Sequence, residues 1–197
     1  SRYACFFDVE WDSADPESRQ TVLLPVLGDH YGRVLEAGEL RVERVDGGFH
    51  VAYHDHRYPL APPSGEELVV EAGHRAASDE MVFLGGALGR LPDSSVTDRE
   101  SLVRRSRDKE VLRAAIARLV RERPEVGVAI DAVIKELNAD HDRLDALLGE
   151  QNYRLAFWRA AGQELGYRRF FDVTSLIGLR MEDERVFRDT HELVLAW

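Results

Sequence analysis

Residues 151–182 read QNYRLAFWRAAGQELGYRRFFDVTSLIGLRME, a segment with far more aromatic rings and arginines than an average protein sequence. Leu155, Trp158 and Leu165 recur at helical spacing, after a polar residue suited to an N-cap and before a glycine suited to end a helix. We therefore expect an amphipathic helix over residues 152–165.

The residues that follow, 167–173, predict a strand that carries arginine on both faces. Side chains alternate along a strand, so Arg168 shares one face with Phe170. Arg169 lies on the other face, with the aromatic residues Tyr167 and Phe171 on either side of it. A guanidinium group is always charged and brings five donors, so it needs carboxylate partners if buried and offers polar recognition if exposed. Rings beside arginines are typical of sugar sites, although core aromatics with ordinary ion pairs remain the alternative.

Size and charge limit the classes of function. The chain has 197 residues, 44% of them hydrophobic, which suffices for a real core. Lys and Arg number 26 against 36 Asp and Glu, and the net charge of -10 opposes nonspecific binding to nucleic acid or to anionic membranes. The single Cys5 excludes an intrachain disulfide framework, and no apolar run approaches the roughly 20 residues of a membrane span. We expect a soluble cytoplasmic protein whose two ends look cut from something longer.

Residues 1–60 predict β structure. In FFDVEWD, Asp8, Glu10 and Asp12 share one strand face, which we interpret as solvated rather than catalytic or metal-binding. A second strand, TVLLPV, contains Pro25, which predicts a sheet edge or a strand end.

The clearest local signal is a hairpin in which ELRVERV and GFHVAYH flank the dipeptide at residues 46–47, Asp-Gly. This dipeptide accepts the positive φ angles of a type I′ turn. His54 and His56 follow, with an aspartate between them. Two histidines and one acid are too few ligands for a metal site, so no metal is predicted.

Prolines at residues 59–63 predict a boundary or a long loop, and residues 66–94 give no consistent pattern. Their glycines do not match a phosphate-binding loop, so no nucleotide cofactor is predicted. From residue 95 onward, apolar stripes predict three or four short amphipathic helices. The predicted fold class is α+β, with three parts: a β-rich α+β subdomain over 1–94, a helical bundle over 95–150, and a helix-strand-helix segment over 151–197.

Several long words of this sequence together resemble one enzyme family. They are QNYRLAFWRAA, YRRFFDV, LIGLRME and VFRDTH near the end, and ACFFDVEWD, VLLPVLG and YHDHRYPL near the start. In this order they are similar to the maltooligosyl trehalose synthase family, α-amylase-like enzymes of glycoside hydrolase family 13. Gly166 departs from the asparagine that is usual in the family, and Thr174 and Ser175 replace an asparagine and an acidic residue.

The resemblance implies a fold and an activity. Family members isomerise the reducing-end α-1,4 link of maltooligosaccharides to an α,α-1,1 link by intramolecular transglucosylation, a step of trehalose biosynthesis. The matching part is an insertion after the third strand of a (β/α)8 barrel, and residues from about Gln151 return to the barrel. The catalytic carboxylates lie outside this segment, so the chain has no catalytic residue and is expected to be inactive alone. No cofactor is implied. The implied partners are a maltooligosaccharide, bound through the complete enzyme, and the barrel of the same polypeptide.

The resemblance also suggests which residues wall the substrate cleft. The predicted substrate-binding residues are Tyr153, Arg154, Trp158, Arg168, Arg169 and Phe171, and the predicted supporting residues are Asp172, Arg180 and Glu182. The alternative role is to fasten the insertion to the barrel; it stays open for Arg168 and Arg169 and is preferred for Arg180 and Glu182. A non-catalytic carbohydrate-binding or interaction module is the second hypothesis, and an independent enzyme is the weakest.

Overall fold

The computed structural model describes residues 6–9, 21–92, 99–162, 165–171 and 173–197. It confirms a mixed fold of small sheets and helices. The chain forms two compact units. Unit 1 combines residues 1–27 with residues 153–197, and unit 2 comprises residues 28–152.

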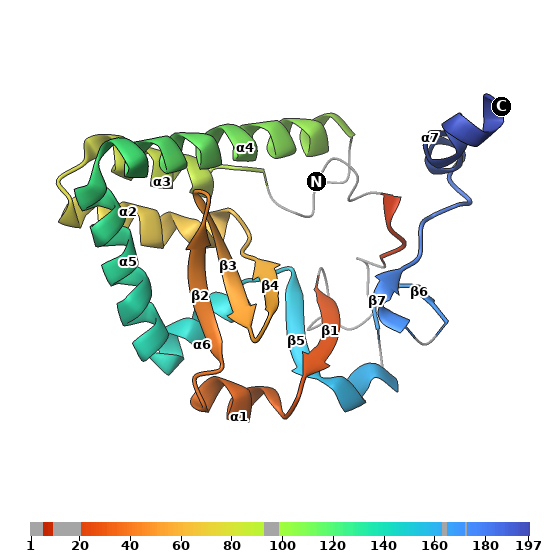
Figure 1. The fold of residues 1–197 in the computed structure, drawn as a ribbon, viewed down its shortest axis with the longest axis horizontal. Helices are drawn as coiled ribbons and strands as arrows, with labels where there is room; N and C mark the ends of the chain where they lie inside the picture. The colour runs from red at the N-terminus through yellow and green to blue at the C-terminus, as the bar shows by residue number, and fades with distance from the viewer. Residues whose placement is uncertain (1–5, 10–20, 93–98, 163–164, 172) are drawn as a thin grey trace. The chain divides into compact units, whose positions relative to one another are not determined.

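Unit 2 contains the predicted hairpin and is built around it. Strands β2 (Leu40–Val45), β3 (Gly48–Tyr53) and β4 (His56–Pro59) form an antiparallel sheet in the order β2-β3-β4. The turn residues Asp46 and Gly47 have φ angles of 48° and 72°, which confirms the positive values expected for this dipeptide. A Cβ atom on Gly47 would lie 2.2 Å from a backbone oxygen of helix α4 (Arg99–Glu122), so the turn requires glycine for space as well as for φ. Figure 1 shows the hairpin turn directed toward α4.

The helices of unit 2 begin earlier than the sequence predicted. Besides α1 (Tyr31–Glu36) and the short η2 turn (Pro63–Gly65), the segment without a consistent pattern forms α2 (Glu66–Arg75) and α3 (Asp79–Gly89). These two helices pack so closely that a Cβ on Gly85 would lie 2.7 Å from a valine methyl of α2. Glycine lowers helix propensity, and here it serves the packing. This conflict explains why the local sequence did not predict the helices.

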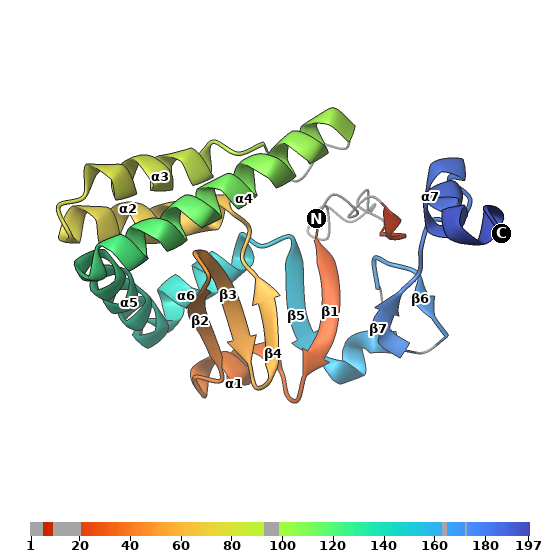
Figure 2. The ribbon, with the colours of Figure 1, turned by 45° about the horizontal axis from the view of Figure 1, so that its top comes forward.

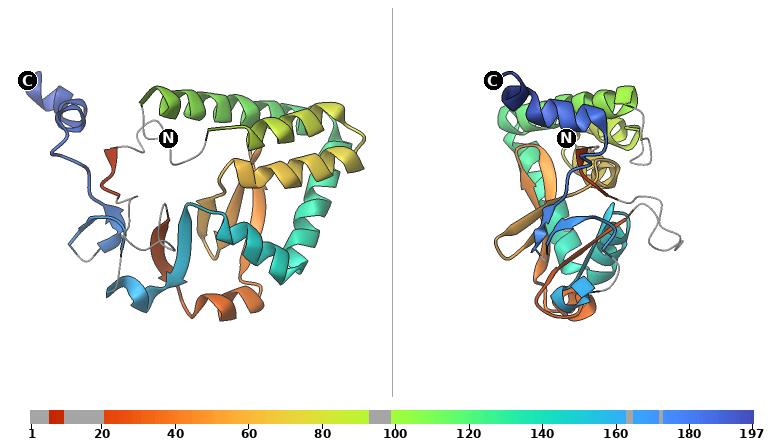
Figure 3. Two further views of the ribbon diagram at one scale, coloured as in Figure 1. Left: turned by 180° about the vertical axis from the view of Figure 1, so that it is seen from behind. Right: turned by 90° about the vertical axis from the view of Figure 1, so that its right-hand side faces the viewer.

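The later helices match the predicted stripes, with one correction. Helix α4 is one continuous helix of 24 residues, not two short ones. Pro124 occupies the first turn of α5 (Pro124–Ala139), where its missing N–H costs nothing, and α6 (His141–Gly149) ends at a glycine. In Figures 2 and 3, α4 and α5 follow each other at a sharp angle around the sheet.

Two side-chain amides, one half-buried and one buried, tie the sheet and the helices of unit 2 together. Asn138 of α5 accepts a hydrogen bond from the Val42 N–H at 2.7 Å and donates one to the Val42 carbonyl at 2.9 Å. It thereby satisfies backbone groups on the edge strand β2 that have no neighbouring strand there. Gln151, which is 3% exposed, accepts from the Ala61 N–H at 2.8 Å and donates to the Leu147 carbonyl at 2.6 Å. The hairpin and helices α2 to α6 all lie in unit 2, whereas the sequence placed a subdomain boundary at residue 94.

In unit 1, the segment predicted to be an amphipathic helix has a different secondary structure. Residues 152–165 are not an amphipathic helix: Tyr153–Phe157 form strand β5, and Trp158–Gly162 form the 3-10 helix η3. Strand β5 pairs in parallel with β1 (Val22–Leu27), and tertiary pairing of this kind overrides helix-like spacing in a short segment. Pro25 lies within β1, which pairs with β5 alone in a two-stranded sheet and so fits the predicted sheet edge.

The rest of unit 1 consists of a hairpin and a terminal helix. The predicted strand over residues 167–173 is shorter: β6 (Arg169–Phe170) pairs antiparallel with β7 (Val173–Ile177). Helix α7 (Glu184–Leu195) begins after Asp183, whose carboxylate accepts from the Arg185 N–H. Val9, Val22 and Tyr167 form a small core.

Candidate functional site

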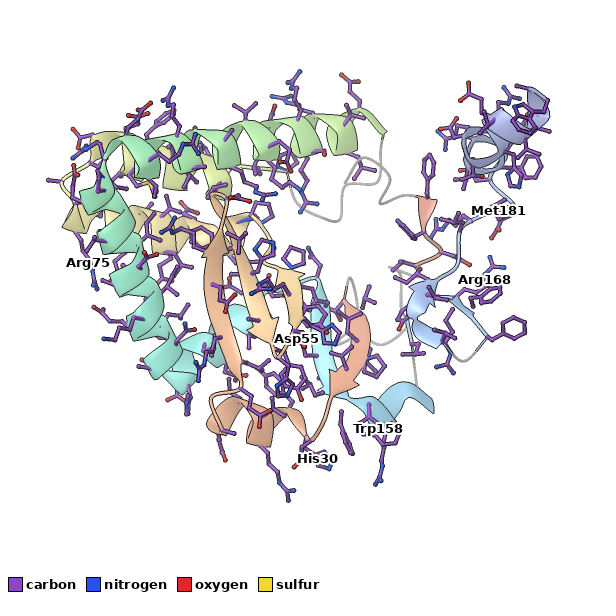
Figure 4. All side chains as sticks on the ribbon, in the orientation of Figure 1. His30, Asp55, Arg75, Trp158, Arg168 and Met181 are labelled. Atoms are coloured by element: carbon purple, nitrogen blue, oxygen red, sulfur yellow. The ribbon has the colours of Figure 1, made fainter. Side chains whose placement is uncertain are left out.

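The predicted site residues that the structure describes all lie in unit 1. Tyr153 and Arg154 are on β5, Trp158 begins η3, and Arg168 immediately precedes β6. Asp172, predicted as a supporting residue, lies outside the described residues. Figure 4 marks Trp158 and Arg168 on their separate segments.

The structure brings three predicted site residues, Arg168, Arg180 and Glu182, close to Asp8. The sequence had placed Asp8 on a solvated strand face. Arg168 donates from Nε to an Asp8 carboxylate oxygen and from Nη2 to Glu182 Oε1 at 2.9 Å. Arg180 Nε lies 3.6 Å from Asp8 Oδ1, and its Nη2 donates to the Val9 carbonyl at 2.5 Å. We call Asp8, Arg168, Arg180 and Glu182 the Asp8 network. The hydrogen bond that Arg168 donates to the Asp8 carboxylate raises the pKa of the Arg168 guanidinium, which stays charged.

The interpretation of Asp8 as part of a solvated strand face is wrong. Backbone hydrogen bonds hold its segment between two others: the Asp8 N–H donates to the Gly178 carbonyl at 2.8 Å, and the Arg168 N–H donates to the Asp8 carbonyl at 2.9 Å. The side chain is therefore aimed at arginines on both neighbouring segments. The other two carboxylates of that predicted face, Glu10 and Asp12, lie outside the described residues.

Two phenylalanines are exposed on the β6–β7 hairpin, Phe170 at the end of β6 and Phe171 in the turn that follows. The rings of Phe170 and Phe171 meet edge to face with centroids 4.6 Å apart, and the Phe171 side chain is 81% exposed. Phe171 also has a φ angle of 53°, which is costly for a bulky residue. Exposed rings on a strained turn are typical of a contact surface.

A second exposed ring has a cation beside it that the sequence did not single out. Trp158 is 54% exposed, and its ring meets that of Phe157 edge to face at 5.8 Å. The Arg159 guanidinium lies 5.1 Å from the Trp158 ring centroid, within the range of a cation–π interaction. The adjacent Trp-Arg pair was the available sequence signal.

The remaining predicted residues are placed differently. Tyr153 is half-buried and packs against the small core of unit 1, so its ring serves packing. Arg169 is half-buried on β6 opposite Ile177, and Arg154 is exposed on β5. Among the described residues, no hydrogen bond or ion pair links Arg154 or Trp158 to the Asp8 network.

Helix α7 exposes a large apolar surface. Val186 is its buried residue, while Leu193, Val194 and Leu195 are exposed and Trp197 is 99% exposed. Helix α7 forms the second helix of the helix-strand-helix segment predicted over residues 151–197. Its apolar residues outside the first turn have no cover within the described part of the chain.

The described polar side chains of unit 2 form ion pairs at its surface and between its helices. The His54 ring lies 3.5 Å from a Glu39 carboxylate oxygen on the exposed surface, and the described residues contain no group of three or more side chains suited to hold a metal. Arg75 of α2, labelled in Figure 4, joins Glu136 of α5 through two hydrogen bonds of 2.6 Å. The Arg75–Glu136 contact links helices α2 and α5. No described helix is both long and apolar enough to cross a membrane.

Comparisons with known proteins support the predicted resemblance. No protein-family model matches the chain. Putative maltooligosyl trehalose synthases of two Mycobacterium tuberculosis strains, CDC 1551 / Oshkosh and H37Rv, are 49% identical over 59 residues, which is 30% of this chain. The match spans 6% of the length of these relatives.

Solved structures of similar proteins cover nearly the whole chain. A maltooligosyl trehalose synthase crystal structure has 19% identity and a TM-score of 0.48 over all of this chain and 15% of its own. A mutant of the Arthrobacter ramosus maltooligosyltrehalose synthase has 25% identity and a TM-score of 0.43 over 99% of this chain and 14% of its own. The sequence match confirms that the chain is similar to maltooligosyl trehalose synthases.

Proposed function

We propose that this chain is a segment of a maltooligosyl trehalose synthase, an enzyme that isomerises the reducing-end α-1,4 link of a maltooligosaccharide to an α,α-1,1 link. The observation that carries the proposal is the 49% identity over 59 residues. The segment walls or supports the substrate cleft and has no activity alone.

The connection between β1 and β5 fits an inserted domain. Parallel neighbouring strands need a crossover connection, which is usually a single helix. Here the connection from Leu27 to Tyr153 contains all of unit 2. A domain in this position is the expected form of a long insertion after a barrel strand, where barrel enzymes build their active sites.

The chemistry of unit 1 fits a cleft wall better than a catalytic centre. Transfer by the retaining route needs two carboxyl groups about 5 Å apart across the anomeric carbon, and the rest of the polypeptide would supply them. A transferring enzyme must also keep water from the glycosyl intermediate. Exposed rings such as Trp158 and Phe171 suit both covering a sugar face and excluding water.

Within this proposal, the residues divide into two roles. Arg154, Trp158, Arg168, Arg169 and Phe171 contact the substrate, and Tyr153, also predicted to do so, acts from behind the surface because it packs on the core. Glu182 supports Arg168 through a direct ion pair, and Arg180 pairs with Asp8, the acid that also pairs with Arg168. Asp172 is expected to have a supporting role as well.

The partners follow from the same proposal. The apolar face of α7 would pack against the barrel of the same polypeptide, since exposed apolar groups of this extent usually mark an interface. The enzyme would act in the cytoplasm, without a cofactor and without binding nucleic acid or membranes. A non-catalytic carbohydrate-binding module is not favoured, because the relatives matched by sequence are called synthases.

The test uses the complete polypeptide encoded by the gene that contains this segment. With maltopentaose, we expect the complete polypeptide to form a product without a reducing end, and the 197-residue chain to form none. Failure of the complete polypeptide to convert maltopentaose, or turnover by the segment alone, would overturn the proposal.

A variant then tests the cleft role. Arg169→Ala in the complete polypeptide should raise KM or the share of hydrolysis, because it removes a contact to the sugar or to its enclosure. Arg33→Ala, which removes an exposed arginine of unit 2, is the matched control. An unchanged KM and product ratio together with lower thermal stability would instead assign Arg169 to fastening the segment.

A further inference from the structure

Asp8 has a place in unit 1 that the proposed roles of its neighbours do not account for. It comes from the start of the chain, yet its carboxylate contacts arginines 160 and more residues later. The side chain is only 23% exposed, while the Arg168 side chain is 58% exposed. The acid is therefore the inner member of the pair and the arginine is the outer member.

The contacts that Arg168 makes with described residues involve two of its three guanidinium nitrogens. Nε donates to Asp8 and Nη2 donates to Glu182, and no described residue accepts a hydrogen bond from Nη1. A planar guanidinium held at two nitrogens has little freedom to turn. Its Nη1 therefore presents two N–H donors in a set direction.

The charges of the Asp8 network favour a neutral ligand. Its two carboxylates and two guanidinium groups sum to zero, so an anion gains little net attraction. Hydroxyl groups need only a well-placed donor, and a donor fixed in advance loses less side-chain entropy on binding.

We propose that Asp8 is a positioning residue that holds Arg168 so that its Nη1 edge donates to a hydroxyl of a neutral glucan. This inference rests on the proposed function for the identity of the ligand. The positioning itself is a property of unit 1 and can be measured separately.

The positioning is tested first on the 197-residue chain by NMR of arginine side chains. The Arg168 Nε–H should give a sharp, slowly exchanging signal, because it donates to a carboxylate. Asp8→Asn should broaden or remove that signal, and Asp8→Glu should partly restore it. Asp131→Asn is the matched control, because it breaks the Arg44–Asp131 pair of unit 2, and it should leave the Arg168 signal unchanged. An Arg168 signal that is the same in wild type and Asp8→Asn would overturn the inference.

The consequence for the ligand is tested on the complete polypeptide with maltopentaose. Asp8→Asn should raise KM about three- to tenfold with kcat nearly unchanged, as expected when an interaction common to ground and transition state is lost. Asp131→Asn, which breaks an ion pair of unit 2, should leave KM unchanged. If Asp8→Asn and the control have the same KM, the proposed contact between Arg168 and the ligand is overturned. If the wild type does not convert maltopentaose, the proposed function is overturned, and the NMR result alone decides whether Asp8 positions Arg168.

Discussion

Replacing Gln151 should destabilise unit 2 more than any exposed substitution near it. Its side chain accepts from the Ala61 N–H and donates to Ser64 Oγ and the Leu147 carbonyl, at 2.8, 3.0 and 2.6 Å. Gln151→Leu keeps a similar volume and removes all three interactions. The Ser64 hydroxyl can turn toward another partner, but the two backbone groups are fixed and become unsatisfied.

The magnitude follows from those two backbone groups. An unsatisfied buried donor or acceptor costs roughly 1–3 kcal/mol, and the added apolar burial of leucine offsets part of the sum. The expected loss is about 3 kcal/mol of the free energy of unfolding, which corresponds to a shift of about 2 M in the urea midpoint for a typical slope.

The two units can be followed by different signals in one experiment. All three tryptophans of the sequence lie in residues 1–27 and 153–197, so tryptophan fluorescence reports on unit 1. Far-ultraviolet circular dichroism reports mainly on the helices of unit 2. Gln151→Leu should shift the dichroism transition, and the exposed control Glu150→Gln should change stability by less than about 0.5 kcal/mol. A Gln151→Leu midpoint equal to that of the control would refute the reasoning.

Three further substitutions test the packing and charge of unit 2. Asn138→Leu should cost about 2 kcal/mol in urea unfolding, because two backbone groups of β2 lose their partner; a loss below that of an exposed substitution would contradict this role. Gly85→Ala should cost about 1–3 kcal/mol by overpacking against α2, while Gly32→Ala, with open space around it, should be neutral or stabilising. Equal effects would show that space is not the reason. Burial and the Arg113 charge lower the pKa of His50 from 6.5, so the folded state binds fewer protons and stability is lost as pH falls below 6.5. His50→Gln should reduce that loss in urea titrations at several pH values, and an unchanged pH dependence would count against it.

The sequence predicted an element correctly where the residues of that element are sufficient to determine its structure. The Asp46-Gly47 turn needs positive φ angles that this dipeptide adopts readily, so the hairpin could be predicted. The apolar stripes of α5 and α6, with Pro124 and Gly149 at their ends, were sufficient for the same reason. The words that resemble the synthase family were also legible from sequence alone.

Other elements were not predicted because their structure depends on packing or pairing with a different segment of the chain. Helices α2 and α3 contain glycines such as Gly85 that weaken the helical signal and are explained only by the neighbouring helix. The spacing of residues 152–165 indicated a helix, but β5 forms because β1 offers a parallel partner.

The sequence by itself determined which chemical groups the candidate surface holds: rings, guanidinium groups and carboxylates near the end of the chain, with the family that they resemble. Only the tertiary structure decided which of them meet. Asp8 was assigned to solvent because nothing near it in sequence needs a carboxylate, yet folding sets it against Arg168 and Arg180. The reason is physical: the strength of a charge pair depends on distance and solvent exposure, and neither can be read from positions 160 residues apart.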